Sequence, residues 1–170
     1  YSHIRLWGSI GFIFAALSLG VMIDSYGERS LIYALLITQL VIFFLAFILP
    51  EKKINFTKFN KRSIWPILKK REVIVLLLSC ALMVSSHGLL YNFYSIFLED
   101  HSYSGATIGL LWSVGVVFEI LIFLLMPKIL SKFTLKSVLL TSIAFAVLRF
   151  FLIGAYVDSI LILIAAQIMH

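Results

Sequence analysis

Two opposite charges lie deep inside consecutive apolar stretches of the chain, Glu119 in residues 108–126 and Arg149 in residues 135–156. A charge in the hydrocarbon of a membrane costs about 3 kcal/mol on insertion scales. A chain keeps such a charge only where it meets a partner or faces water, so a functional role is the default hypothesis. We therefore predict that Glu119 and Arg149 form the coupling site of a secondary transporter.

The depths of the two charges allow them to meet. With a helical rise of 1.5 Å per residue, Glu119 lies about 12 Å from the membrane edge near Pro127. Arg149 lies about 21 Å from the edge near Leu135, which leaves a gap of about 9 Å along the membrane normal. Two long side chains reaching toward each other close this gap directly, and water or a solute bridges it equally well.

Two histidines extend the polar set. His87, in the apolar stretch 73–98, lies near the depth of Arg149, and Tyr91 follows it on the same helical face with Asn92 alongside. His170 ends the partial apolar stretch 160–170. A carboxylate, an arginine and a titratable imidazole are the parts of a proton relay, because a moving solute changes the balance of charge among them.

A plainer interpretation of these residues exists. Glu119 and Arg149 could do no more than lock two helices together, and His87 could be a core histidine whose hydrogen bonds are satisfied. The presence of His87 and His170 at membrane depth, in addition to one ion pair, makes this interpretation the weaker one.

Composition places the whole chain in a membrane. Hydrophobic residues make up 62% of the 170 residues and charged residues 13%, and the mean hydropathy is +1.07. A soluble domain has about 25% charged residues. The net charge of +6 comes from loops that flank apolar stretches, which excludes nucleic acid as the expected partner. The single cysteine, Cys80, excludes an internal disulfide, and we expect it to be a small buried hydrophobe.

The apolar stretches predict an all-α polytopic membrane protein. The predicted spans are residues 6–23, 31–49, 73–98, 108–126, 135–156 and a partial span from residue 160. The last stretch is about half as long as a bilayer requires, and the chain does not begin with Met. We therefore expect this chain to be the middle segment of a larger protein.

Basic residues set the expected orientation. Most of the fourteen Lys and Arg residues fall on one side of the predicted spans, in the loops 51–72 and 127–134 and close to them. We therefore predict that these two loops are cytoplasmic. The apolar residues of 51–71 predict a short interfacial helix. On the opposite side, the segment from Asp24 to Arg29 is predicted to be a tight turn, although it loosely matches a cytoplasmic loop motif of known transporters.

Two motifs carry a resemblance to a known family. They are Tyr1-x-x-Ile4-Arg5-Leu6-Trp7-Gly8-Ser9-Ile10-Gly11-Phe12 and Tyr103-Ser104 followed by Ile108-Gly109-Leu110-Leu111-Trp112-Ser113-Val114-Gly115-Val116-Val117-x-Glu119. The first resembles the fifth helix, and the second the eighth helix, of the 3-phenylpropionic-acid transporter group of the major facilitator superfamily. Arg149 and Gln167-Ile168-x-His170 continue the match.

The resemblance implies how the chain is divided. It places helices five to nine, and the start of helix ten, of a twelve-helix fold in this chain. Residues 1–50 would then be the last two helices of the N-terminal bundle, and 51–72 the cytoplasmic loop between bundles. Residues 73–170 would be the first helices of the C-terminal bundle.

The same group is similar to lactose permease and its oligosaccharide–proton symporter relatives. In those proteins a Glu on helix eight, an Arg on helix nine and a His on helix ten serve sugar binding and proton coupling. Glu119, Arg149 and His170 stand at the matching places. His87 stands on helix seven, where lactose permease has acidic residues, and this difference argues against a sugar.

The expected function is proton-coupled symport of a small organic solute by alternating access. An aromatic or aliphatic acid would suit Arg149, whereas a sugar or nucleoside would suit hydrogen-bonding groups. The predicted coupling and binding residues are Glu119, Arg149, His170 and His87, and the predicted lining residues are Tyr91, Asn92 and Trp112.

The alternative is a non-transporting membrane sensor or scaffold on the same fold. An intramembrane enzyme is not expected, because no His-Glu-x-x-His motif is present and Ser85, Ser86 and His87 are merely contiguous. We expect no metal and no cofactor other than the proton as coupling ion. The expected partners are the solute, protons and the lipid bilayer, for a monomer in a bacterial inner membrane.

Overall fold

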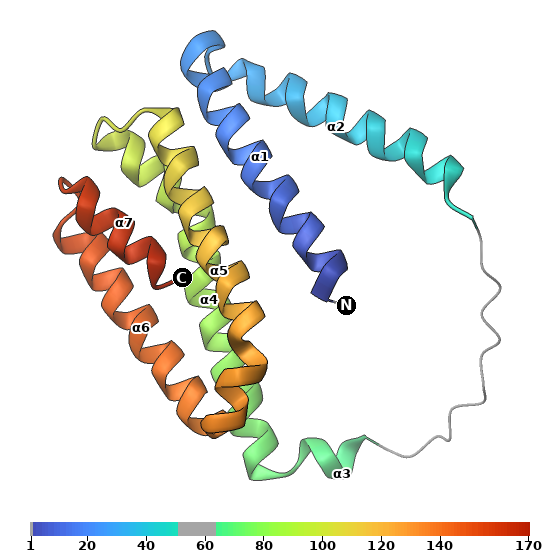
Figure 1. Ribbon diagram of the computed structural model, residues 1–170, viewed down its shortest axis with the longest axis vertical. Helices are drawn as coiled ribbons and strands as arrows, with labels where there is room; N and C mark the ends of the chain where they lie inside the picture. The colour runs from blue at the N-terminus through green and yellow to red at the C-terminus, as the bar shows by residue number, and fades with distance from the viewer. Residues whose placement is uncertain (1, 51–63) are drawn as a thin grey trace. The chain divides into compact units, whose positions relative to one another are not determined.

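The computed structural model describes residues 2–50 and 64–170, and in these ranges the protein is all-α (Figure 1). The described helices are α1 (Ser2–Tyr26), α2 (Arg29–Ile48), α3 (Trp65–Leu68), α4 (Arg71–Asp100), α5 (Gly105–Lys132), α6 (Leu135–Ala155) and α7 (Ile160–Ile168). Five of them, α1, α2, α4, α5 and α6, are long and apolar enough to cross a membrane. The predicted fold class is therefore confirmed.

The chain divides into two compact units, which we describe separately. One unit comprises Tyr1–Ala34 and Ser95–His170, and so contains α1, the end of α4, α5, α6 and α7. The other comprises Leu35–Tyr94, with most of α2 and α4. The predicted boundary between two bundles at 51–72 remains a prediction, because residues 51–63 lie outside the described residues. Of the predicted interfacial helix, the described part is the four-residue α3.

The predicted basic loop 127–134 is mostly helical. Helix α5 continues through Pro127 to Lys132, and only Phe133 and Thr134 connect it to α6. Proline lacks the N–H that a helix interior uses, so the sequence favoured a break at this position. Near a membrane edge, water or a neighbouring side chain can bond the carbonyl that proline leaves unbonded, and the helix survives. Thr134 then caps α6 by accepting a hydrogen bond from the backbone N–H of Ser137 at 3.2 Å.

The predicted turn from Asp24 to Arg29 is also shorter than expected. Helix α1 includes Asp24 and runs on to Tyr26, and the reversal is made at Gly27 and Glu28. Gly27 adopts φ +78°, a left-handed conformation that glycine accepts without a steric penalty. Asp24 therefore belongs to the last turn of a helix, where its side chain can reach a neighbouring element.

Helices α1 and α5 approach so closely that their backbones touch. A Cβ atom added to Gly20 would lie 2.3 Å from the carbonyl oxygen of Gly105. A Cβ atom added to Gly109 would lie 2.3 Å from the carbonyl oxygen of Ala16. Small residues permit this kind of close helix packing in lipid, where apolar surface alone gives no preference for one helix over the hydrocarbon. Gly20 thus serves the packing of α1 on α5.

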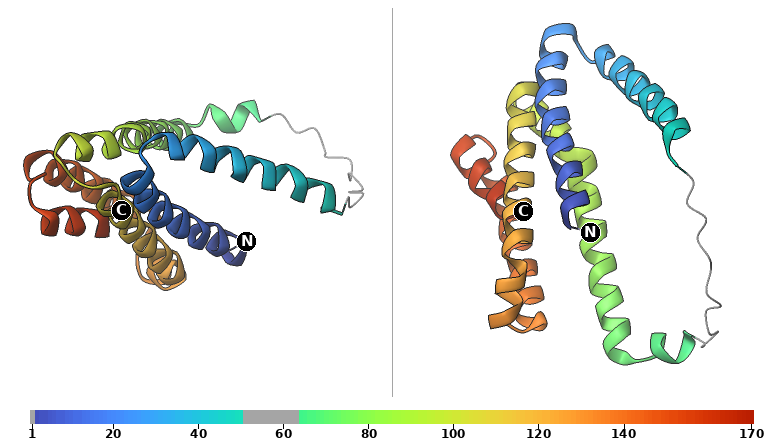
Figure 2. Two further views of the ribbon diagram at one scale, coloured as in Figure 1. Left: turned by 90° about the horizontal axis from the view of Figure 1, so that it is seen from above. Right: turned by 45° about the vertical axis from the view of Figure 1, so that its right-hand side comes forward.

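The buried core of this unit lies around the start of α5. Leu98, Leu111 and Leu163 are fully buried, and the Tyr103 hydroxyl donates to the carbonyl of Val157 at 2.7 Å. This bond ties the α4–α5 turn to the α6–α7 turn, and α7 packs on both α5 and α6 (Figure 2). The core thereby fixes the start of α7 against its two neighbours.

Cys80 is exposed, not buried as expected. It lies on α4, where most of the apolar side chains around it are exposed. Such a surface suits lipid, because a small apolar side chain gains as much from hydrocarbon as from a protein core.

Candidate functional site

Arg149 is the most deeply buried charge in the described chain. It lies on α6, its side chain is 1% exposed, and its Nη1 contacts Nδ1 of His170 at the end of α7. An arginine has only donors, so Arg149 must donate and the His170 nitrogen must accept. A hydrogen bond between these two atoms therefore requires a neutral His170 imidazole with its proton on Nε2. A second proton on this ring would occupy the acceptor and break the contact.

Gly115 of α5 makes room for this pair. A Cβ atom at Gly115 would lie 3.6 Å from Cβ of His170 and 3.0 Å from Oε1 of Gln167. The missing side chain lets α7 lie close against α5, so that His170 is held between α5 and α6. Three helices thus converge on one point, and the polar atoms there come from α6 and α7.

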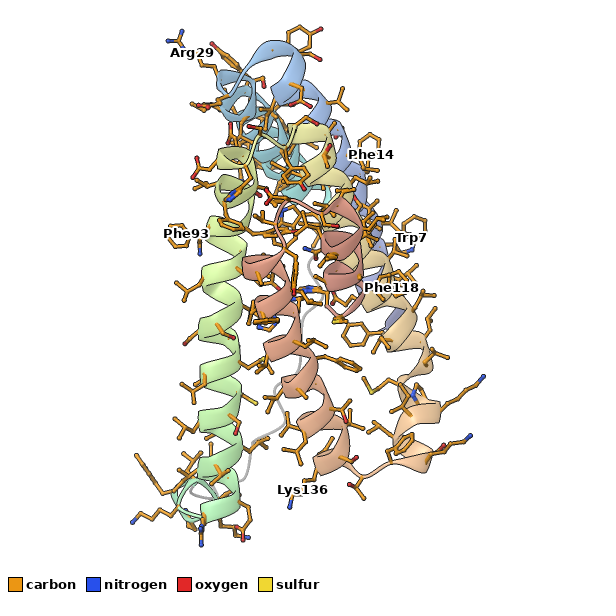
Figure 3. The ribbon with its side chains drawn as sticks, turned by 90° about the vertical axis from the view of Figure 1, so that its left-hand side faces the viewer. Trp7, Phe14, Arg29, Phe93, Phe118 and Lys136 are labelled. Carbon is orange, nitrogen blue, oxygen red and sulfur yellow. The ribbon has the colours of Figure 1, made fainter. Side chains whose placement is uncertain are left out.

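Glu119 lies next to this point. It follows Gly115 by one helical turn on α5, so the two positions share a face, and its side chain is half-buried. Phe118, labelled in Figure 3, marks this level on α5. The sequence placed Glu119 and Arg149 at compatible depths, and the structure orients the Gly115–Glu119 face of α5 toward the helix that carries His170.

Gln167 is a member of the site that sequence reasoning did not select. Its side chain is fully buried, and neither its Nε2 nor its Oε1 has a hydrogen-bond partner in the described part of the chain. An unbonded amide in a buried setting is costly, and natural structures keep one mainly where it serves a role. The sequence contained one signal that could have identified Gln167, which is its spacing. Gln167 precedes His170 by three residues and therefore lies on the same helical face.

The cluster formed by Arg149, His170, Gln167 and Glu119 has a definite chemistry. A fixed cation can hold an anionic group through two parallel N–H donors. A neutral imidazole and a carboxylate can each accept a proton, and an amide can orient a ligand. No group of three or more His, Cys, Asp or Glu residues suited to a metal ion occurs within residues 2–50 and 64–170. The site is therefore equipped for anions and protons.

The other predicted residues on α4 belong to the second compact unit. His87 donates from Nδ1 to the carbonyl of Met83 at 2.9 Å, and its ring lies 6.1 Å from the ring of Tyr91. Asn92 donates to the carbonyl of Gly88 at 2.6 Å. These bonds and this ring contact lie within α4. Their roles remain predictions.

Trp112 lies on α5 among contacts that hold helices together. Its indole N–H donates to the hydroxyl of Ser95 at 3.0 Å, and the ring of Phe12 meets it edge-on with centroids 6.5 Å apart. Trp112 thus links α5 to the end of α4 and to α1. Its predicted role as a lining residue remains a prediction, and the observed role is packing.

Comparisons with known proteins show the family to which this chain belongs. The MFS_1-like family model matches residues 1–170, the whole chain. The chain belongs to the MFS_1-like family. This family is a branch of the major facilitator superfamily, as the motifs predicted.

A curated relative of this MFS_1-like chain is the "Probable 3-phenylpropionic acid transporter" of Escherichia coli (strain K12). It is 30% identical over 175 residues, which cover 100% of this chain and 45% of the relative. The chain thus spans less than half the length of this relative. No solved structure matched the chain. The family match and this relative agree with the predicted membership of the major facilitator superfamily.

Proposed function

We propose that the full-length protein is a secondary transporter that carries a small aromatic carboxylic acid together with a proton. The observation that carries the proposal is the buried Arg149 donating to a neutral His170. A buried cation beside a neutral base suits an anionic solute. The relative described as a probable 3-phenylpropionic acid transporter supports the same solute class.

The proposed coupling follows from competition for the arginine. A solute carboxylate accepts two hydrogen bonds from the Arg149 guanidinium and takes the place of His170. The released Nδ1 of His170 is then free to accept a proton, and Glu119 is the nearby carboxylate that can pass it on. The anion and the proton bring opposite charges, so the loaded site gains no net charge in a low-dielectric setting. An empty site binds the proton less well because Arg149 occupies the acceptor.

The proposed setting is a multi-pass protein of a bacterial inner membrane, acting as a monomer by alternating access. The basic segments 51–72 and 127–134 would face the cytoplasm under the positive-inside rule. The ends of α1 and α4, with Asp24 and Asp100, would then face outward.

The decisive experiment follows external pH around right-side-out vesicles that contain the full-length protein. We expect added 3-phenylpropionate to make the medium more alkaline as the proton enters with the acid. Sugars and nucleosides serve as comparison solutes, because they lack the carboxylate that Arg149 would hold. Tight binding of one solute without any pH change would contradict symport and favour a sensor on the same fold.

Gln167 is expected to hold the solute as well. Leucine is similar in size to glutamine but lacks its amide, so Gln167→Leu removes the hydrogen bond that the amide would give the solute. One hydrogen bond to a charged group is worth roughly 1.5–3 kcal/mol. We therefore expect the KM for 3-phenylpropionate to rise about tenfold or more, with the number of protons per solute unchanged. Initial rates of alkalinisation at increasing solute concentration measure both quantities.

Gln39→Leu is the matched control for this variant, because Gln39 is an exposed glutamine on α2. We expect it to leave the KM unchanged. An unchanged KM in Gln167→Leu would assign the Gln167 amide to helix packing instead of solute binding.

A further inference from the structure

The carboxylate of Asp24 closes the start of a helix that lies far away in the sequence. Its Oδ1 accepts from the backbone N–H of Gly105 at 2.7 Å, and its Oδ2 accepts from the N–H of Ala106 at 2.8 Å. Ser104 accepts from the N–H of Thr107 at 3.3 Å. The first backbone donors of α5 are thus shared between a local cap and a residue of α1. An ordinary helix would satisfy all of them locally or with water.

The charge of Asp24 suits this place. The start of a helix carries a partial positive charge, so a carboxylate there is favoured over a neutral side chain. Both carboxylate oxygens are used, and hydrogen bonds to a charged acceptor are about twice as strong as neutral ones. These two hydrogen bonds are therefore stronger than two neutral ones. Because Asp24 is exposed, water can take the place of the N–H donors for Asp24, and of the carboxylate for the N–H groups.

The closest approach of the two backbones lies in the half of α1 that carries Asp24. Beside Asp24, the backbones of α1 and α5 touch at Gly20 and Gly105. Nearer the start of α1, a Cβ atom at Gly8 or Gly11 would meet no atom of the described residues within 4 Å. The ribbons of α1 and α5 accordingly converge at the Asp24 end and separate toward the other end (Figure 1).

We propose that Asp24 is a latch that holds the end of α1 against α5 and closes one mouth of the transport path. This inference rests on the proposed function, because a latch has a role only if α1 and α5 separate during transport. In the proposed orientation the closed mouth is the outer one. To open it, the Asp24 carboxylate must leave the N–H groups of Gly105 and Ala106 and the glycine contact beside them must part.

Two features of the Asp24 contact suit a contact that opens and closes during transport. The Asp24 carboxylate and its two N–H donors lie at the water-exposed end of the helices. When the contact breaks, each of these groups can bond water instead, and no unpaired charge is buried. The contact between backbones at Gly20 depends on the absence of side chains, so no side chain interlocks the two helices at this point. The two states of the mouth can therefore differ by little free energy, and the Asp24 bonds can decide between them.

The test measures opening directly, without solute. The full-length protein carries Ala106→Cys as a reporter, in a Cys80→Ser background, because Ala106 is half-buried and its Cα faces Gly20 at close range. A membrane-impermeant maleimide is added from outside. We expect Asp24→Asn and Asp24→Ala to raise the labelling rate about tenfold, since each removes charge-assisted bonds that exist only in the closed state.

Two controls separate opening from general damage. Glu28→Gln removes a neighbouring exposed carboxylate and should leave the labelling rate at the wild-type value. A second reporter, Ser102→Cys in the exposed turn before α5, should react equally fast in every variant. Asp24→Glu keeps the charge and should restore part of the protection.

The outcomes distinguish this inference from the proposed function. Equal labelling of the Ala106→Cys reporter in wild type, Asp24→Asn and Asp24→Ala would overturn the latch, even if the protein proves to be a proton-coupled transporter. Faster labelling in the Asp24 variants would support the latch, even if no tested acid moves protons. A uniform increase at both reporters would contradict the latch, because it would show loss of the fold instead of opening at one mouth.

Discussion

Replacing Arg149 by glutamine is expected to reduce solute-driven proton entry about 100-fold, to the level of vesicles without the protein. The guanidinium is 1% exposed and contacts His170, so no other described cation can take its place at the carboxylate. Hydrogen bonds between a charged donor and acceptor are worth roughly 1.5–3 kcal/mol each, and two of them are lost. Initial rates of external alkalinisation with 3-phenylpropionate measure the effect.

Arg149→Lys and Arg29→Gln make this measurement specific. Lysine keeps the charge but offers a point donor in place of a planar fork, so we expect Arg149→Lys to remain strongly impaired. Arg29 lies at the exposed start of α2, and its replacement should leave the rate unchanged. Wild-type rates in Arg149→Gln would remove Arg149 from the proposed site.

Glu119→Gln separates proton movement from solute binding. The amide keeps the size of the carboxylate and removes its ability to carry a proton, so we expect net proton entry to stop. Exchange of labelled for unlabelled acid should persist, because exchange needs no release of the proton. If Glu119→Gln and Arg149→Gln both accumulated solute at the wild-type rate, the site as a whole would be wrong.

The sequence predicted the membrane spans well because length and hydropathy alone determine them. Residues 31–49 and 135–156 correspond to α2 and α6 within two residues at each end. Helix ends set by local hydrogen bonds were harder to predict. Pro127 suggested a break, and Asp24 suggested a turn, because proline and aspartate are unfavourable inside an isolated helix. In the folded chain Asp24 lies in the last turn of α1, where another helix supplies its partners, and Pro127 lies inside α5, more than one turn before its end.

The sequence predicted a depth for each of the two charges but not the direction in which each side chain points. Hydropathy gives the level of Glu119 and Arg149 along the membrane normal, and says little about which face of each helix meets which neighbour. The contact between Arg149 and His170 depends on where α7 packs, and that depends on the missing side chain of Gly115. A single glycine in an apolar span carries no signal of this kind. Gln167 was overlooked for the same reason, since its burial is a property of three helices together.

The glycines between α1 and α5 lead to the second large effect. Gly109→Ala places a Cβ atom 2.3 Å from the carbonyl oxygen of Ala16, a distance that requires the backbones to move apart. Forcing an extra methyl group into a packed interface typically costs about 1–3 kcal/mol. We expect the closed mouth to be destabilised and the rate of solute-driven alkalinisation to fall at least about tenfold. Binding of the acid should be retained, because Gly109 lies six residues before Gly115, the first site position on α5, which is about 9 Å along the helix.

Gly11→Ala is the matched control, and it makes the comparison independent of helix propensity. Alanine favours a helix over glycine by roughly 1 kcal/mol in both variants, so this gain cancels in the comparison. A Cβ atom at Gly11 would meet nothing within 4 Å in the described residues, whereas the one at Gly109 meets backbone. A difference in transport between the two variants therefore reports the contact between α1 and α5. Equal rates in Gly11→Ala and Gly109→Ala would show that α1 and α5 need not touch during transport, and the Asp24 bonds would then be a static helix cap.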